Sequence, residues 1–252
     1  MNTQKNTSFV YKNHEEKLLR ENIVSSGIIT QEQLQDIKSA YHENVPYHNF
    51  LHALMVAKAI LLLPKEEYDI IEIRSLFIAA LFHDAGHTWV AGLLDEFRSL
   101  DIAFQGIIDF EKKYDYAGID YGIVRKAIIW TVFKNRAKNT DPYAILLADL
   151  DVSTIGMIFP AFLYYCDFPI CLEFGKNIEE WLDDINYFKF LLSVDKHVFR
   201  TECVKSMFPD ALKNMKLYTS LPKSILIKAF HFWKSDITYA EFESNFQKIQ
   251  KN

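Results

Sequence analysis

The sequence is poor in glycine and proline, with eight and seven of them among 252 residues. Folds made of many short strands use these residues at their turns, and segments that alternate polar and apolar side chains are also missing. This scarcity argues against a β-sandwich or a β-barrel. The three cysteines, Cys166, Cys171 and Cys203, form no C-x-x-C pair. Their odd number therefore excludes a complete disulfide framework, and their spacing disfavours a zinc knuckle.

Runs of basic residues and long apolar segments are also absent. The net charge is −5 and no run of Lys or Arg stands out, so a nucleic-acid polymer is not an expected partner. The longest apolar run, "IGMIFPAFLYYC", is interrupted by Pro160 and is too short to span a membrane. The first residues have no apolar stretch of the kind found in secretory signals. We therefore expect a cytoplasmic protein that does not associate with membranes.

The periodicity that is present is helical. Apolar residues recur at spacings of three and four in "HALMVAKAILLL", "IIEIRSLFIAALF" and "IVRKAIIWTVF". Half of the residues are hydrophobic, which is ample for a packed core. No repeat and no linker rich in Gly, Ser or Pro divides the chain. The sequence predicts an all-α fold with a single domain over residues 1–252.

Several helix boundaries can be predicted from capping residues. Pro142 is a favourable first residue for the helix that contains "LLADLDV", and residues 178–199 read as one long amphipathic helix. Three pairs have the spacing of a capping box: Asn13 with Glu16, Thr30 with Gln33, and Thr238 with Glu241.

Histidine is unevenly distributed, because five of the eight lie between residues 42 and 87. A single buried histidine is usually a hydrogen-bonded core residue, so the grouping matters more than any one member. His52 follows His48 by four residues, and Pro46 favours a helix start near Tyr47. On such a helix both imidazoles would face one side.

A second pair of potential metal ligands follows the apolar segment "IIEIRSLFIAALF". His83 and Asp84 are adjacent there, and Gly86 gives the chain freedom to turn so that both side chains reach one ion. Neutral imidazole and carboxylate together suit Zn, Fe or Mn, and Mg where oxygen ligands dominate. Divalent metal ions, one or two of them, are therefore the predicted cofactors.

The segment "LLADLDV" offers a further carboxylate from either Asp149 or Asp151. On a helix these two side chains diverge by about 200°, so at most one can face the histidines. Asp149 lies within an apolar run, where an unpaired carboxylate would be costly to bury and a metal would compensate it. The alternative is that Asp149 pairs with a lysine or arginine while Asp151 lies on the surface.

Together, three blocks resemble the HD superfamily of metal-dependent phosphohydrolases. They are "YHNFLHA" at 47–53, "HDAGH" at 83–87 and "ADL" at 148–150. More narrowly, the chain looks like the catalytic domain of class I 3′,5′-cyclic nucleotide phosphodiesterases and their small bacterial relatives. The resemblance covers roughly residues 41–155. It implies a compact helical bundle, with the C-terminal helices of residues 156–252 packed on this core.

The resemblance also implies roles for individual residues. His48 would be the general acid, His87 would lie close to a water that bridges two ions, and Asp84 would bridge to the second ion. The expected ligands of the first ion are His52, His83, Asp84 and Asp149.

Glu96 stands in "EFRSLDIA", which looks like a helix start of bacterial HD hydrolases. By this resemblance Glu96 would hold metal-bound water or orient a ligand, with Asp101 a weaker candidate. Alternatively, Glu96 is an acid in the first turn of a helix, where it favours the helix dipole. The sequence departs from the family at Met55, where an acid is usual, and at Thr88-Trp89 in place of Pro-Gly.

The expected function is hydrolysis of a phosphoester in a small nucleotide, first of all a cyclic nucleotide phosphodiester. A nucleotidase or phosphomonoesterase is the main alternative, because it would use the same groups. A di-iron HD oxygenase ranks lower, since such enzymes add histidine ligands and none occurs between His87 and His197. A non-catalytic, metal-stabilised regulatory domain also ranks low, because it would need no general acid.

Overall fold

A computed structural model describes residues 12–42, 45–87, 93–114, 118–131, 138–184 and 199–251. Within these ranges, the side chains of residues 93–97 and 99 are not described. The described chain is helical and contains no strand, which confirms the all-α prediction. None of its helices is both long enough and apolar enough to cross a membrane.

The described chain forms α-helices and two short helices of other types. In chain order they are α1 (Asn13–Ser25), α2 (Gln31–Lys38), α3 (Phe50–Ile60), α4 (Ile70–Phe82), α5 (Leu93–Tyr114), α6 (Tyr121–Ile129), α7 (Pro142–Asp151), the 3₁₀-helix η2 (Ser153–Gly156), α8 (Phe159–Phe162), the π-helix η3 (Leu163–Asp167), α9 (Phe168–Glu173), α10 (Ile178–Leu182), α12 (Glu202–Met207), α13 (Ala211–Ser220), α14 (Lys223–Trp233) and α15 (Tyr239–Lys251).

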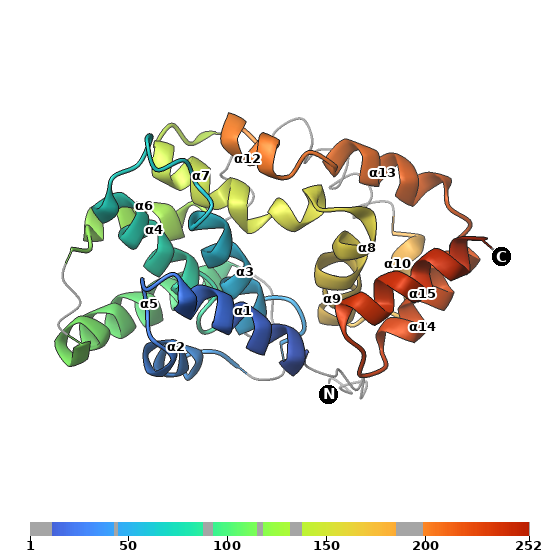
Figure 1. The fold of residues 1–252 in the computed structure, drawn as a ribbon, viewed down its shortest axis with the longest axis horizontal. Helices are drawn as coiled ribbons and strands as arrows, with labels where there is room; N and C mark the ends of the chain where they lie inside the picture. The colour runs from blue at the N-terminus through green and yellow to red at the C-terminus, as the bar shows by residue number, and fades with distance from the viewer. Residues whose placement is uncertain are drawn as a thin grey trace.

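The helices form two neighbouring groups (Figure 1). The first contains α1 to α7, in which α3 packs against α4 and α1, and α6 packs against α4 and α7. The second contains α8, α9, α10, α14 and α15, while α12 and α13 run along one edge of the molecule (Figure 1). Lys12, which precedes α1, forms hydrogen bonds with the second group. Its Nζ donates to the carbonyls of Trp233, at the end of α14, and of Ser235 at 2.9 Å each.

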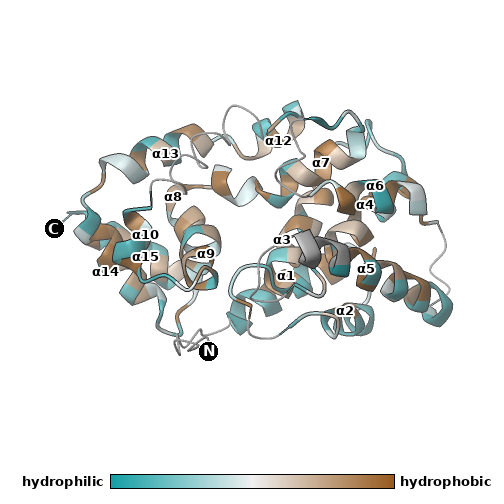
Figure 2. Cartoon of the chain, turned by 180° about the vertical axis from the view of Figure 1, so that it is seen from behind, coloured by the Kyte–Doolittle hydropathy of each residue, from teal (hydrophilic) through white to brown (hydrophobic). Residues whose placement is uncertain are grey.

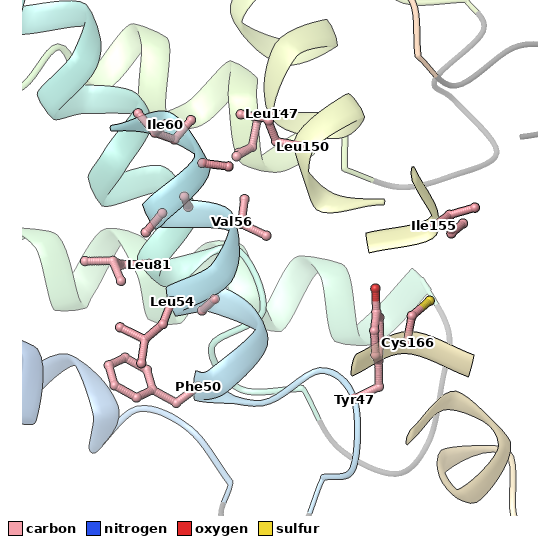
Figure 3. Close-up of a cluster of buried hydrophobic side chains, with 14 of the residues drawn as sticks. Tyr47, Phe50, Leu54, Val56, Ile60, Leu81, Leu147, Leu150, Ile155 and Cys166 are labelled. Carbon is pink, nitrogen blue, oxygen red and sulfur yellow. The ribbon is translucent and has the colours of Figure 1, made fainter. Parts of the chain in front are cut away.

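Buried hydrophobic side chains form a cluster that reaches from Ile23 to Phe246. At its centre, Leu54 and Val56 of α3 lie near Leu81 of α4 and Leu147 of α7 (Figure 3). The outer helices are amphipathic, and α5 shows hydrophobic and hydrophilic residues in alternation along its length (Figure 2). The apolar stripe of each outer helix therefore faces the common core.

Most of the predicted helix starts agree with the structure. Pro142 is the first residue of α7. Hydrogen bonds of the capping-box type are formed by two of the three predicted pairs, Thr30 with Gln33 and Thr238 with Glu241.

Two predictions about helices are wrong. Asn13 does not cap α1 but is its first residue, and the Glu16 carboxylate instead forms ion pairs with Arg20 and Lys38. The long helix predicted over residues 178–199 is a short one, because α10 ends at Leu182. Residues 185–198 of that segment lie outside the described residues.

Candidate metal centre

Three helix ends bring four metal-binding side chains together. His52 lies in the first turn of α3, His83 and Asp84 directly follow α4, and Asp151 is the last residue of α7. All four residues are buried or nearly so, and one potential ligand atom from each lies within 4.8 Å of the others. The core packing of α3 against α4 and α7 therefore positions a candidate metal centre.

The distances between these atoms fit a coordination sphere. His52 Nε2 lies 3.0 Å from Asp151 Oδ1 and 3.6 Å from Asp84 Oδ2. His83 Nε2 lies 3.1 Å from Asp84 Oδ2 and 3.4 Å from Asp151 Oδ1. Ligands held about 2.1 Å from one ion are separated by about 3.0 Å in an octahedron and about 3.4 Å in a tetrahedron. The four side chains could thus bind one ion with little rearrangement.

Two of the converging atoms lack hydrogen bonds. The Nδ1 atom of His83 donates to the carbonyl of Ala80 at 2.8 Å, which leaves Nε2 to carry the lone pair when the ring is neutral. His83 Nε2 and Asp84 Oδ2 are both buried and make no hydrogen bond with any described residue. Leaving such an atom unsatisfied costs about 1–3 kcal/mol. A cation between them would satisfy both, so the residues fit a divalent metal.

The protonation of the cluster follows from its burial and its charges. Burial alone would lower the pKa of His83, but the negative charges of Asp84 and Asp151 outweigh this effect and raise it well above its usual value. Burial would raise the pKa of Asp84, whereas the charges of His83 and His48 lower it overall. A proton and a divalent cation would therefore compete for the lone pair of His83 Nε2, because the carboxylates of Asp84 and Asp151 attract both.

The structure corrects the expected ligand set at its fourth member. Asp151, not Asp149, faces His52 and His83. Asp149 Oδ2 instead accepts hydrogen bonds of 2.7 Å from the backbone N of Arg200, the backbone N of Thr201 and the Thr201 hydroxyl. Two residues along a helix place side chains on nearly opposite sides, so only one of the two aspartates can reach the histidines. Asp149 thus forms hydrogen bonds with the two residues that directly precede α12.

A second group shares one residue with the first. His48, Asp84 and His87 also offer atoms within 4.8 Å of one another. His87 Nε2 lies 3.6 Å from Asp84 Oδ1, and the His48 and His87 rings stack with centroids 4.6 Å apart. Because Asp84 directs one oxygen to each group, it could bridge two ions, as the resemblance implies.

His48 lies outside the helix that was predicted to carry it. Asn49 caps α3, with its side chain accepting from the backbone N of Leu51 at 2.9 Å and of His52 at 3.2 Å. The helix therefore begins at Phe50 and not near Tyr47. The backbone before the cap is free to turn the His48 ring towards His87, while Tyr47 packs against the His52 ring with centroids 4.5 Å apart.

A glutamate that the sequence analysis did not identify holds His48. Glu173, the last residue of α9, contacts His48 Nδ1 through Oε1. Its Oε2 accepts from the backbone N of Tyr47 at 2.8 Å and of His48 at 3.1 Å. A signal existed in the sequence, since Glu173 and Asp167 are the only charged residues between positions 155 and 174.

The pairing sets the charge of both partners. Burial would lower the pKa of His48, but the charge of Glu173, supported by Asp84 and Asp151, raises it to about 10. Burial would raise the pKa of Glu173, while the His48 charge and the hydrogen bonds from residues 47 and 48 lower it. At neutral pH, His48 is therefore a cation that lies beside the first group of potential ligands and is not itself available as a ligand.

The remaining expected residues can be placed only in part. Glu96 lies on α5, but its side chain is outside the described part of the structure, as are Thr88 and Trp89. Asp101 is exposed on the same helix. The comparisons with known proteins give no further assignment: no protein-family model matches the chain, and a search of curated proteins found no match.

Proposed function

We propose that this protein is a metal-dependent phosphohydrolase that cleaves a phosphoester of a small nucleotide. The observation that carries the proposal is the convergence of His52, His83, Asp84 and Asp151 beside a charged His48 that Glu173 orients. Such a set combines cation ligands with a proton donor, which a purely structural metal site would not need. The resemblance of the three sequence blocks to cyclic nucleotide phosphodiesterases makes a cyclic nucleotide the first substrate to test.

The chemistry is divided between the ion and the protein. When bound, a divalent ion would act as a Lewis acid that lowers the pKa of water and neutralises phosphoryl charge. Glu173 occupies His48 Nδ1, so the proton available for transfer is on Nε2. His48 would donate this proton to the departing alkoxide oxygen. Glu173 is the main cause of the raised His48 pKa, and a cation near Asp84 would offset the smaller contribution of Asp84, which would make His48 a stronger acid.

The test couples metal content to turnover. The chain would be stripped with a chelator, reloaded with Mn²⁺, Mg²⁺, Zn²⁺ or Fe²⁺, and assayed on cyclic nucleotides, nucleoside monophosphates and bis-p-nitrophenyl phosphate. We expect His83→Ala and Asp84→Ala to lose metal and turnover together. His48→Ala should retain the metal and lose rate by about 10²–10⁴-fold, the usual contribution of a general acid.

Asp109→Ala, a change of an exposed acid on α5, serves as the control and should retain both properties. Activity in a metal-free Asp84→Ala protein would refute the proposal. Turnover of monoesters alone would assign a nucleotidase, whereas an iron-dependent EPR signal with oxygen consumption would assign an oxygenase instead.

A further inference from the structure

An apolar groove is lined mainly by residues of α1 and α3. Its volume is about 460 Å³, which falls in the usual range of small-molecule sites. Met55 borders this groove and also a smaller cavity that His52 and Tyr47 line, so the groove is one side chain away from a potential metal ligand. The apolar part of its lining is formed by Leu18, Leu19, Met55, Ala59, Leu62, Met157 and Phe208.

Two of the lining leucines are unusually exposed. Leu18 and Leu62 expose 42% and 62% of their surface. Single exposed leucines are common on protein surfaces, but apolar side chains grouped around a concave site mark a binding surface. Burying them under an apolar ligand would be favourable by the hydrophobic effect.

The charged residues that line the groove indicate which charge a ligand would carry. Lys58 of α3 lines the groove and makes no hydrogen bond or ion pair with another described residue. Glu15, the acid in the lining, is already engaged, because its two oxygens accept from Tyr165 Oη at 2.9 Å and from the backbone N of Tyr239 at 2.7 Å. Both Glu15 oxygens thus already have donors, whereas the Lys58 ammonium is the charged group of the lining whose hydrogen bonds are left for a ligand.

We propose that this groove binds a small aliphatic carboxylate. The hydrocarbon chain would cover Leu18, Leu62 and Met55, and the carboxylate would pair with Lys58. The site is separate from the proposed hydrolytic function, since it requires neither bound metal nor turnover.

The test is calorimetric titration of the full chain with octanoate and, as an uncharged analogue, with 1-octanol. We expect saturable binding of one octanoate per chain. Lys58→Met, which keeps the length of the side chain, should weaken octanoate binding by about three- to fivefold, as expected for a partly exposed ion pair, and leave 1-octanol binding unchanged. Lys65→Met is the matched control, because Lys65 lines a different groove, and it should change neither affinity.

Three results would overturn the proposal. The first is the absence of saturable octanoate binding by the unaltered protein, and the second is an equal loss in the two lysine variants. The third is a concentration-dependent dimer in sedimentation equilibrium that Leu62→Ser abolishes, which would make the groove a self-association surface. None of these measurements depends on catalysis, so they leave the proposed function to its own test.

Discussion

The two aspartates of α7 have separable roles. Asp151→Asn should abolish tight cation binding, because it removes a ligand charge 3.0 Å from His52 Nε2. Asp149→Asn should retain the cation but lower the free energy of unfolding by about 1–3 kcal/mol, since it weakens hydrogen bonds from Arg200 and Thr201 to a charged acceptor. Metal titration and urea denaturation measure the two effects. The opposite pattern would restore Asp149 as the ligand.

At the residue scale, local sequence motifs were informative. The resemblance of two short histidine motifs to a known family led us to expect His52, His83 and Asp84 as ligands, and the structure places potential ligand atoms of all three within 4.8 Å of one another. The choice between Asp149 and Asp151 could not be made in this way, because it depends on the phase and end point of α7. Glu173 was missed because its contact with His48 spans 125 residues of sequence, a pairing that only the tertiary fold creates.

The pairing of His48 with Glu173 predicts that the free energy of unfolding of the metal-free protein depends on pH. His48 should titrate near pH 10, against a usual value of 6.5, and Glu173→Gln should lower this pKa. Below pH 6.5, His48 is protonated in both the folded and the unfolded chain. The stabilisation of the folded chain by the pairing of His48 with Glu173 is therefore fully present at low pH. It should be lost as pH rises towards 10.

NMR titration of His48 and urea denaturation across this pH range measure the two quantities. The decline in the free energy of unfolding should be smaller in Glu173→Gln. Glu179→Gln, at an exposed position of α10, should behave like the unaltered protein. An identical His48 pKa in the protein with and without Glu173 would contradict the assignment.

Among the helices, the start of α3 matters most for the site. Asn49→Ala should lower the free energy of unfolding by about 1 kcal/mol or more, because it removes the cap on the residues that include His52. Cation affinity should fall as well, since the first turn frays. Asp120→Ala is the matched control, because Asp120 caps α6 in the same manner and α6 carries none of the four ligands. Equal cation affinity in the two variants would show that the cap has no role in positioning His52.

Helices were predictable to different extents. Those with strong apolar periodicity and a local cap, such as α2 and α7, agree with the sequence. The start of α3 was misplaced by three residues because the prediction relied on Pro46, whereas Asn49 caps the helix. Amphipathic periodicity also predicted one long helix from Ile178, whereas α10 ends at Leu182, because periodicity alone does not mark where a helix ends.

For the whole molecule, a bound cation would act as a cross-link between α3, α4 and α7. An ion that binds only the folded chain stabilises it by about 2.7 kcal/mol when its free concentration is one hundred times Kd. For a chain of this size, chelation should then lower Tm by roughly 5–10 °C. Scanning calorimetry with and without chelator measures this shift. Asp151→Asn should show almost none, and an unaltered Tm in the parent chain would argue against a tight site.

The backbone itself contributes to the electrostatics of this centre. Of the four described helices that carry or adjoin the site residues, α4, α7 and α9 place their carboxyl ends at the site and α3 places its amino end there. Each helix terminus carries a partial charge of about half a unit, negative at the carboxyl end. Peptide dipoles therefore add a net negative potential that attracts cations and repels a phosphate arriving alone. If the proposed hydrolysis is correct, the anionic substrate should therefore bind more tightly after the cation than before it.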